Sequence, residues 1–169
     1  WTEVSRKAIP LTTISTDMTW NPADQKVYGA FYNTTKNGYV FGTLDLETGA
    51  VNKLSDITLQ DDKGYPAGFV VIAANSIGEV YGISQMGDLY KFNTEDGSYS
   101  LIGATGYTPL YQQSGCFDFT TKQLYWAACN ENSSGIYQVN TDTGEATLLG
   151  SFNDLEEFVG LYSLSPNAD

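Results

Sequence analysis

The sequence of 169 residues is 41% hydrophobic and 14% aromatic, which is enough to bury the core of one domain or of a piece of a larger one. Its 20 acidic and 8 basic residues give a net charge of -12, which disfavours nucleic acid and an anionic membrane surface as partners. The chain has no histidine, which excludes a Ser/His/Asp triad, a Cys/His pair and an imidazole metal site. We expect no cofactor, no metal and, without an apolar run of roughly 18 residues, no direct membrane insertion.

The first predicted elements make up a four-stranded unit over residues 17–55. Short runs rich in Val, Tyr, Phe and Thr alternate with Asn, Asp and Gly, and no helical i, i+3, i+4, i+7 stripe interrupts them. These runs form two hairpins, MTWNPADQKVYGAFY followed by FGTLDLETGAVNKLS. We therefore expect four antiparallel strands in this unit.

The same unit recurs at 68–103 and at 115–150. Its second hairpin returns as LYKFNTEDGSYSLIG and IYQVNTDTGEATLLG, and its turn glycine recurs at Gly49, Gly97 and Gly144, with spacings of 48 and 47 residues. Four-stranded units at this period are typical of propeller blades, because one blade cannot bury both of its faces alone. The sequence therefore predicts an all-β fold, a β-propeller of four-stranded antiparallel blades with three full blades.

Each shared hairpin has a local physical reason. The side chains of Asp45, Asn93 and Asn140 can accept hydrogen bonds from backbone N–H groups two or three residues on, and the glycine four residues later can adopt a positive φ. The spacing excludes a calcium loop, because an EF-hand needs a longer ligand series that ends in Glu. Two columns of apolar residues are expected to pack between blades. They are Tyr28, Tyr81 and Tyr125 in one column, and Leu54, Ile102 and Leu149 in the other.

Partial blades are expected at both ends of the chain. Residues 1–16 resemble the last strand of a preceding blade, and residues 158–164 resemble the first strand of a next one; the polar residues 165–169 suit the start of a linker. Known propellers have at least about four blades, so three do not readily close a ring. We expect residues 1–164 to be a portion of a larger propeller; a meagre fourth blade and pairing between chains are the alternatives.

Four segments carry a resemblance to known proteins. They are TDMTWNPADQKVYGAFYN, GEVYGISQMGDLYKFNTEDG, TGYTPLYQQSGCFDFTTKQLYWAA and GIYQVNTDTGEATLLG. In these segments the chain resembles the β-propeller region of secreted or surface-anchored proteins of Bacteroidetes, and more loosely the Kelch, YWTD and quinoprotein-like propellers. The resemblance implies a secreted or cell-surface bacterial protein with further blades or modules in the parent chain. It implies no catalytic residue, since the sialidase Asp-box, the paired glycines of Kelch and the WD dipeptide are missing.

The longer connections of the three units are predicted to open on one face, where binding usually takes place on a rigid scaffold. Tyrosine rings can stack on the apolar face of a sugar, and amide side chains can bond its hydroxyls. The same tyrosines can instead pin their loops onto neighbouring blades. The candidate ligand-binding residues are Tyr65, Tyr107, Tyr111, Gln112, Gln113, Asn130 and Asn132.

We therefore expect a non-enzymatic binding or interaction module that recognises a glycan or a protein on the long-loop face. The main alternative is a carbohydrate-active propeller enzyme, in which two loop carboxylates about 5 to 9 Å apart act on a glycosidic bond. A pure structural scaffold is the second alternative. The loop carboxylates available for catalysis are Asp61, Asp62, Asp118, Asp154, Glu156 and Glu157.

The chain contains two cysteines, Cys116 and Cys129. If Phe119 pairs with Leu124 across the TTKQ turn, Cys116 lies opposite Ala127 and diagonal to Cys129 on one face of the sheet. Both a disulfide and a pair of reduced thiols remain open at this point.

Overall fold

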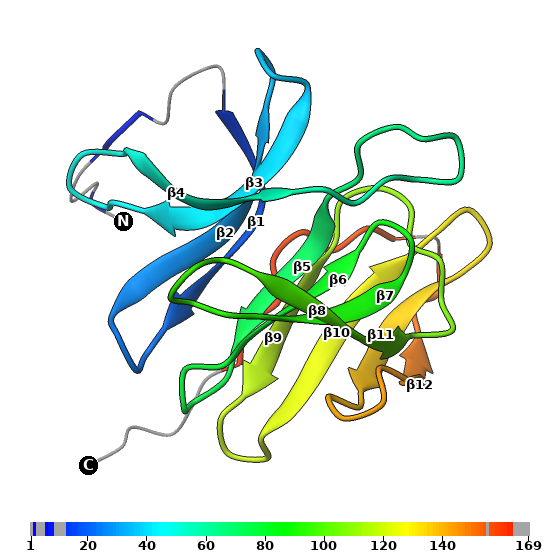
Figure 1. Cartoon of the computed structure of the whole chain (residues 1–169). Helices are drawn as coiled ribbons and strands as arrows, with labels where there is room; N and C mark the ends of the chain where they lie inside the picture. The colour runs from blue at the N-terminus through cyan, green and yellow to red at the C-terminus, as the bar shows by residue number, and fades with distance from the viewer. Residues whose placement is uncertain (1, 3–5, 9–12, 155, 164–169) are drawn as a thin grey trace.

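The computed structural model describes residues 2, 6–8, 13–154 and 156–163. Twelve strands form three four-stranded antiparallel sheets, each with its strands in chain order (Figure 1). The described residues contain no helix, and so none that could span a membrane. The predicted all-β class and the four-stranded antiparallel units are confirmed.

Each sheet corresponds to one repeat of the sequence. Sheet 1 contains β1 (Thr13–Asn21), β2 (Lys26–Asn33), β3 (Gly38–Leu44) and β4 (Val51–Ile57). Sheet 2 contains β5 (Phe69–Ala74), β6 (Val80–Ser84), β7 (Asp88–Phe92) and β8 (Tyr99–Ala104). Sheet 3 contains β9 (Ser114–Asp118), β10 (Gln123–Cys129), β11 (Ser134–Val139) and β12 (Ala146–Ser151).

The ends of the chain differ in part from the expected partial blades. Residues 13–16, expected to belong to a preceding blade, instead begin β1. Residues 158–163, expected to be the first strand of a next blade, have no strand structure. The linker expected at 165–169 lies outside the described residues.

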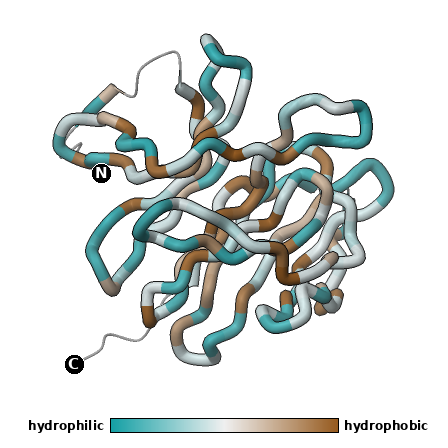
Figure 2. Tube along the Cα trace, viewed as in Figure 1, coloured by the Kyte–Doolittle hydropathy of each residue, from teal (hydrophilic) through white to brown (hydrophobic). Residues whose placement is uncertain are grey.

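The three sheets pack face to face in chain order, with sheet 2 in the middle. One face of sheet 2 places Phe69 and Phe92 in a core shared with Tyr28 of sheet 1. The other face places Ile83 in a core shared with Trp126 of sheet 3. In Figure 2 the apolar positions accordingly concentrate on the strands, while the turns are polar. Because both faces of sheet 2 are covered, every residue of β5 and β6 is buried.

The two predicted columns of packing residues are confirmed between sheets 1 and 2 and between sheets 2 and 3. Tyr28 and Tyr81 are buried in the two cores, and Leu54 and Ile102 pack against them. Within the described residues no sheet follows sheet 3 to cover the last member of each column, and Leu149 is 53% exposed.

The hairpin turns have the predicted chemistry. The carboxylate of Asp45 accepts hydrogen bonds from the N–H groups of Glu47 and Thr48, at 2.8 and 2.9 Å. The side-chain oxygens of Asn93 and Asn140 accept in the same way from residues two positions on. The glycines have φ values of +76°, +75° and +89° at Gly49, Gly97 and Gly144. These sequence signals therefore determine the turns locally.

Side chains of β1 reach across to the backbone of β5. The carboxylate of Asp17 accepts a hydrogen bond from the N–H of Ile72 at 2.7 Å, and the hydroxyl of Thr19 accepts one from Ala74 at 3.1 Å. Burial between the two strands raises the pKa of Asp17 to about 7, against the smaller opposing effect of its backbone hydrogen bonds. These two contacts hold the first strand of sheet 2 against the first strand of sheet 1.

The register of sheet 3 corrects the expectation for the cysteines. Cys116 pairs with Tyr125, two residues from the expected partner Ala127. Cys129 therefore lies four residues further along β10 than the residue opposite Cys116, which is too far for a bond across neighbouring strands. Both cysteines are free thiols.

Candidate functional site

A hollow of about 330 Å³ lies on the long-loop face, where the first strands of sheets 1 and 2 begin and the connection to sheet 3 ends. We call it the loop-face pocket. The described residues of its lining are aromatic, aliphatic, hydroxyl and amide, and none of them is Asp, Glu, Lys or Arg. The lining residues are Ile14, Thr16, Tyr32, Tyr39, Phe69, Val70, Gln85, Tyr111, Gln112 and Gln113.

Sheet 1 contributes a pair of tyrosines to the loop-face pocket. Tyr32 and Tyr39 are direct partners on β2 and β3, and their ring centroids lie 4.9 Å apart. The ring of Tyr39 also lies against Gly68, where an added Cβ would come within 2.5 Å of a ring carbon. The missing side chain at Gly68 therefore lets the ring close onto the start of sheet 2.

The connection to sheet 3 presents Tyr111 at the pocket. Tyr111 has a φ of +67° and its side chain is 62% exposed. A positive φ is unfavourable for an aromatic residue and persists where the surroundings enforce it. Here the N–H of Leu110 donates to the carbonyl of Cys129 at 2.9 Å, and the N–H of Gln112 donates to Glu157 Oε1 at 2.8 Å. The loop is thus fixed on both sides of an exposed ring.

Gln113 lines the same pocket but uses its amide within the protein. Its Nε2 donates to the carbonyls of Leu110 and Cys129, and its Oε1 accepts from Trp126 Nε1 at 2.8 Å. The residue is 2% exposed. Gln113 therefore holds the loop in place and leaves ligand contact to its neighbours Tyr111 and Gln112.

The other four predicted candidates lie outside this pocket. The hydroxyl of Tyr107 donates to the carbonyl of Ser133 at 2.7 Å, which pins the loop as the packing alternative expected. Asn130 Oδ1 accepts from the N–H groups of Asn132 and Ser133, as in an ordinary Asx turn. Asn132 lines a separate polar hollow beside β12, and Tyr65 is 65% exposed in the connection between sheets 1 and 2.

Sequence reasoning did not single out Tyr32, Tyr39 and Gln85 for this pocket. Both tyrosines flank the NTTKNG connection, which the sequence marks as one of the longer loops. Gln85 follows β6, and its Oε1 accepts a hydrogen bond from the N–H of Gly68 at 2.9 Å. The length of this loop was the only feature of the sequence that pointed to these residues. Whether they come together depends on how sheets 1 and 2 pack.

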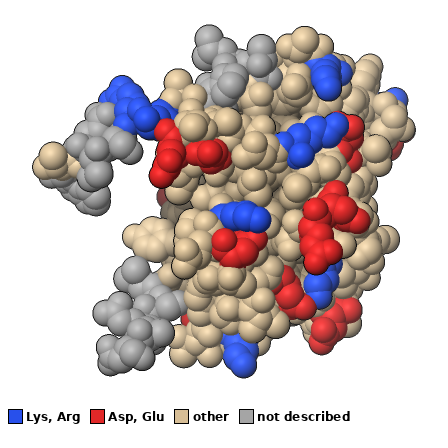
Figure 3. Space-filling model, turned by 60° about the vertical axis from the view of Figure 1, so that its left-hand side comes forward, with Lys and Arg blue, Asp and Glu red and all other residues tan. Residues whose placement is uncertain are grey.

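Three of the six loop carboxylates accept hydrogen bonds from the protein. Asp61 accepts from the N–H groups of Lys63 and Tyr65, and Glu157 accepts from Gln112. Asp118 ends β9, and hydrogen bonds from Thr121 and Thr120 in the turn that follows hold its pKa below the usual value. On the surface in Figure 3, acidic side chains form several separate groups, some beside Lys or Arg. No set of three or more His, Cys, Asp or Glu in the described residues is placed to hold a metal ion.

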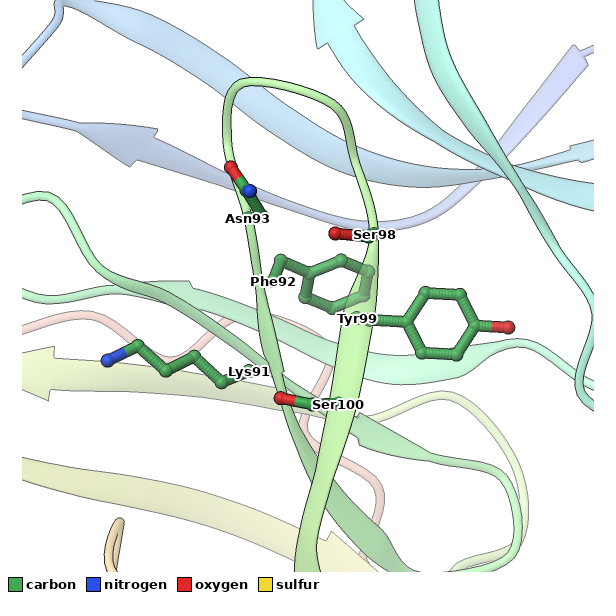
Figure 4. Close-up of a pocket in the computed structure, with 6 residues that line it drawn as sticks. All are labelled: Lys91, Phe92, Asn93, Ser98, Tyr99 and Ser100. Carbon is green, nitrogen blue, oxygen red and sulfur yellow. The ribbon is translucent and has the colours of Figure 1, made fainter.

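A second hollow, of about 300 Å³, is formed by the β7–β8 hairpin alone (Figure 4). Phe92 is buried and stacks on Phe41 with ring centroids 4.0 Å apart. The hydroxyl of Tyr99 accepts from the N–H of Thr58 at 2.8 Å, and in Figure 4 the side chains of Lys91 and Tyr99 extend to opposite sides. These residues pack the hairpin and do not converge on a common point.

No family model and no curated protein sequence matches the chain. Solved structures do resemble it. A chain of the nidogen/laminin complex aligns with a TM-score of 0.62 at 16% identity, covering 84% of this chain and 50% of that one. The hydrazine synthase of Kuenenia stuttgartiensis aligns with a TM-score of 0.51 at 11% identity, covering 88% of this chain and 38% of that one.

The nidogen/laminin neighbour is β-propeller-like, and the three packed sheets described above share this fold. The chain has a β-propeller-like fold. It spans half or less of the length of the two chains it resembles. At such low identity the similarity concerns the fold alone.

Proposed function

We propose that the chain is a non-enzymatic binding module that recognises a neutral glycan in the loop-face pocket. The observation that carries the proposal is the composition of this pocket, which combines exposed tyrosine and amide side chains and, within the part of the chain that the structure describes, has no Asp, Glu, Lys or Arg in its lining. A tyrosine ring stacks on the C–H face of a sugar, while amides bond its hydroxyls.

The size and the rigidity of the pocket fit this class of ligand. Its volume of about 330 Å³ is at the lower end of ligand sites, which supports a contact with one or two sugar rings. The loop that carries Tyr111 is fixed on both sides by hydrogen bonds that its backbone N–H groups donate to the carbonyl of Cys129 and to the carboxylate of Glu157, so little conformational entropy is lost on binding. The alternative within the binding hypothesis is that the same face recognises a protein instead of a glycan.

The architecture we propose is three consecutive blades of a larger propeller. Sheets 1, 2 and 3 correspond to the blades expected at 17–55, 68–103 and 115–150, with sheet 1 beginning already at Thr13, and residues 7–8 and 158–163 belong to neighbouring blades. The sequence resemblance supports a secreted or surface-anchored bacterial protein of the Bacteroidetes, with further blades or modules in the parent chain. The carboxylate enzyme has less support, since Asp61 and Asp118 accept hydrogen bonds from their own local segments and Glu157 accepts one from the backbone of Gln112.

A glycan array followed by calorimetry tests the binding hypothesis. Replacing Tyr111 by Ala should weaken binding of any glycan found by about 5- to 30-fold, the loss of one stacking contact of about 1 to 2 kcal/mol. Tyr65→Ala is the matched control, because Tyr65 is similarly exposed, at 65% against 62%, but lies outside the pocket. An array without binding at high micromolar glycan, or an equal loss in both variants, would contradict the proposal.

A further inference from the structure

The far face of sheet 3, the face turned away from sheet 2, carries residues that are buried at the equivalent positions of sheets 1 and 2. Phe41 and Leu89 occupy one position of the repeat, and both are 0% exposed under the following sheet. Ile136 occupies that position in sheet 3, paired with Ala127, and is partly exposed. Leu149, equivalent to the packed Leu54 of sheet 1, is 53% exposed.

Residues 158–163 run along this face beside β9 (red in Figure 1). The N–H of Leu161 donates to the hydroxyl of Ser114 at 3.1 Å, and the backbone of Ser163 hydrogen-bonds Cys116. These contacts repeat the arrangement between β1 and β5. Ser114 and Cys116 stand at the register positions of Asp17 and Thr19, because their partners on the next strand correspond.

The sequence of residues 158–161 also matches the start of β5. FVGL at 158–161 aligns with FVVI at 69–72, so that Leu161 corresponds to Ile72, which donates to Asp17. The segment thus docks on sheet 3 as β5 docks on sheet 1. Among the described residues it nevertheless pairs with no strand, and Val159 and Tyr162 are 62% and 77% exposed.

At the N-terminal side, sheet 1 shows a contact of the kind that a hairpin turn makes with the last strand of the preceding sheet. In sheets 1 and 2 the hairpin turn at Gly97 packs on Ser55, whose hydroxyl donates to the carbonyl of Gly97 at 2.6 Å. The equivalent turn at Gly49 packs on Ala8, since an added Cβ would lie 2.6 Å from its carbonyl oxygen. Residues 7–8 therefore occupy the place of a last strand of a preceding sheet.

We propose that the far face of sheet 3 and residues 158–163 together form a docking surface for three further strands of the same repeat. Residues 158–163 then serve as the inner strand of a fourth blade, and the added strands pair with their free edge and cover Ile136 and Leu149. The occupant is a three-stranded antiparallel meander with an apolar face, because the contact continues the two sheet–sheet interfaces already present. A free strand edge beside exposed apolar residues is a template for such pairing.

The chain supplies its own probe for this surface. In a variant of the chain, a second copy of residues 75–104 is attached directly after Ser163. This copy contains the β6–β8 meander and the turn before it. The native register is kept, because Ser163 corresponds to Ala74 in the repeat. Hydrogen exchange should show protection of the amides of 160–163 increased by about tenfold or more over the unextended chain. Binding of a dye specific for exposed apolar surface should fall in parallel.

Leu149→Lys provides the control, since this exposed position tolerates a charge in the unextended chain but not under a fourth blade. The extended variant with this substitution should lose the added protection. Unchanged exchange and rapid proteolysis of the appended strands would overturn the proposal. So would an unextended chain that dimerises in light scattering and becomes monomeric with Leu149→Lys, because a second copy would then occupy the face. The inference does not depend on the loop-face pocket.

Discussion

Replacing Asp17 by Asn should remove a large part of the pH dependence of stability. The pKa of Asp17 rises from an ordinary 3.8 to about 7 in the folded chain, chiefly because the group is buried between β1 and β5. In the unfolded chain the carboxyl ionises above about pH 4, whereas in the folded chain it stays protonated up to about pH 7. The folded chain therefore binds more protons across this window, and stability falls as the pH rises through it.

The magnitude follows from the two pKa values. Between about pH 5 and about pH 8 this carboxyl lowers the free energy of unfolding by up to about 2.5 kcal/mol, and partial solvent access reduces the effect. Asn has no charge to desolvate, and its Oδ1 can still accept the hydrogen bond from Ile72 N–H. The variant should therefore gain stability over the natural chain as the pH is raised, with the gain largest above pH 7.

Urea unfolding of both chains at about pH 5 and about pH 8 measures this difference. Asp62→Asn is the control, because Asp62 is exposed in the connection between sheets 1 and 2. If the stability difference between the Asp17 variant and the natural chain is the same at both pH values, the reasoning from burial is refuted.

Three further predictions concern the loop-face pocket and its support. Gly68→Ala should lower the free energy of unfolding by about 1 to 3 kcal/mol, because the new Cβ would lie 2.5 Å from a carbon of the Tyr39 ring. Chemical unfolding measures this loss, and an unchanged midpoint would contradict the close approach. Gln113→Met should cost about 2 kcal/mol, since Trp126 Nε1–H loses its buried acceptor; a drop below about 0.5 kcal/mol in the same assay would show that water replaces the amide. Tyr111→Gly should raise the thermal midpoint slightly by relieving about 1 kcal/mol of strain at φ +67°, whereas it weakens glycan binding; a lower midpoint would argue against stored strain.

The candidate site was only partly predictable. The sequence pointed to the segment that holds Tyr111 and Gln112, because an exposed aromatic and an amide in a long loop stand out locally. It did not reveal that Tyr32 and Tyr39 complete the pocket, since these residues come from another sheet. The sequence also does not indicate that the side-chain amide of Gln113 makes its hydrogen bonds within the protein.

The sequence by itself determined the repeat, the strands and their turns. Asp45 and Gly49 act within six residues of each other, so the same hairpin forms wherever their pattern recurs. Only the tertiary structure decided the register that places Cys116 opposite Tyr125, the burial that raises the pKa of Asp17, and the course of 158–163 along β9. Those features arise where segments distant in sequence meet, and their free energies depend on packing that no local pattern specifies.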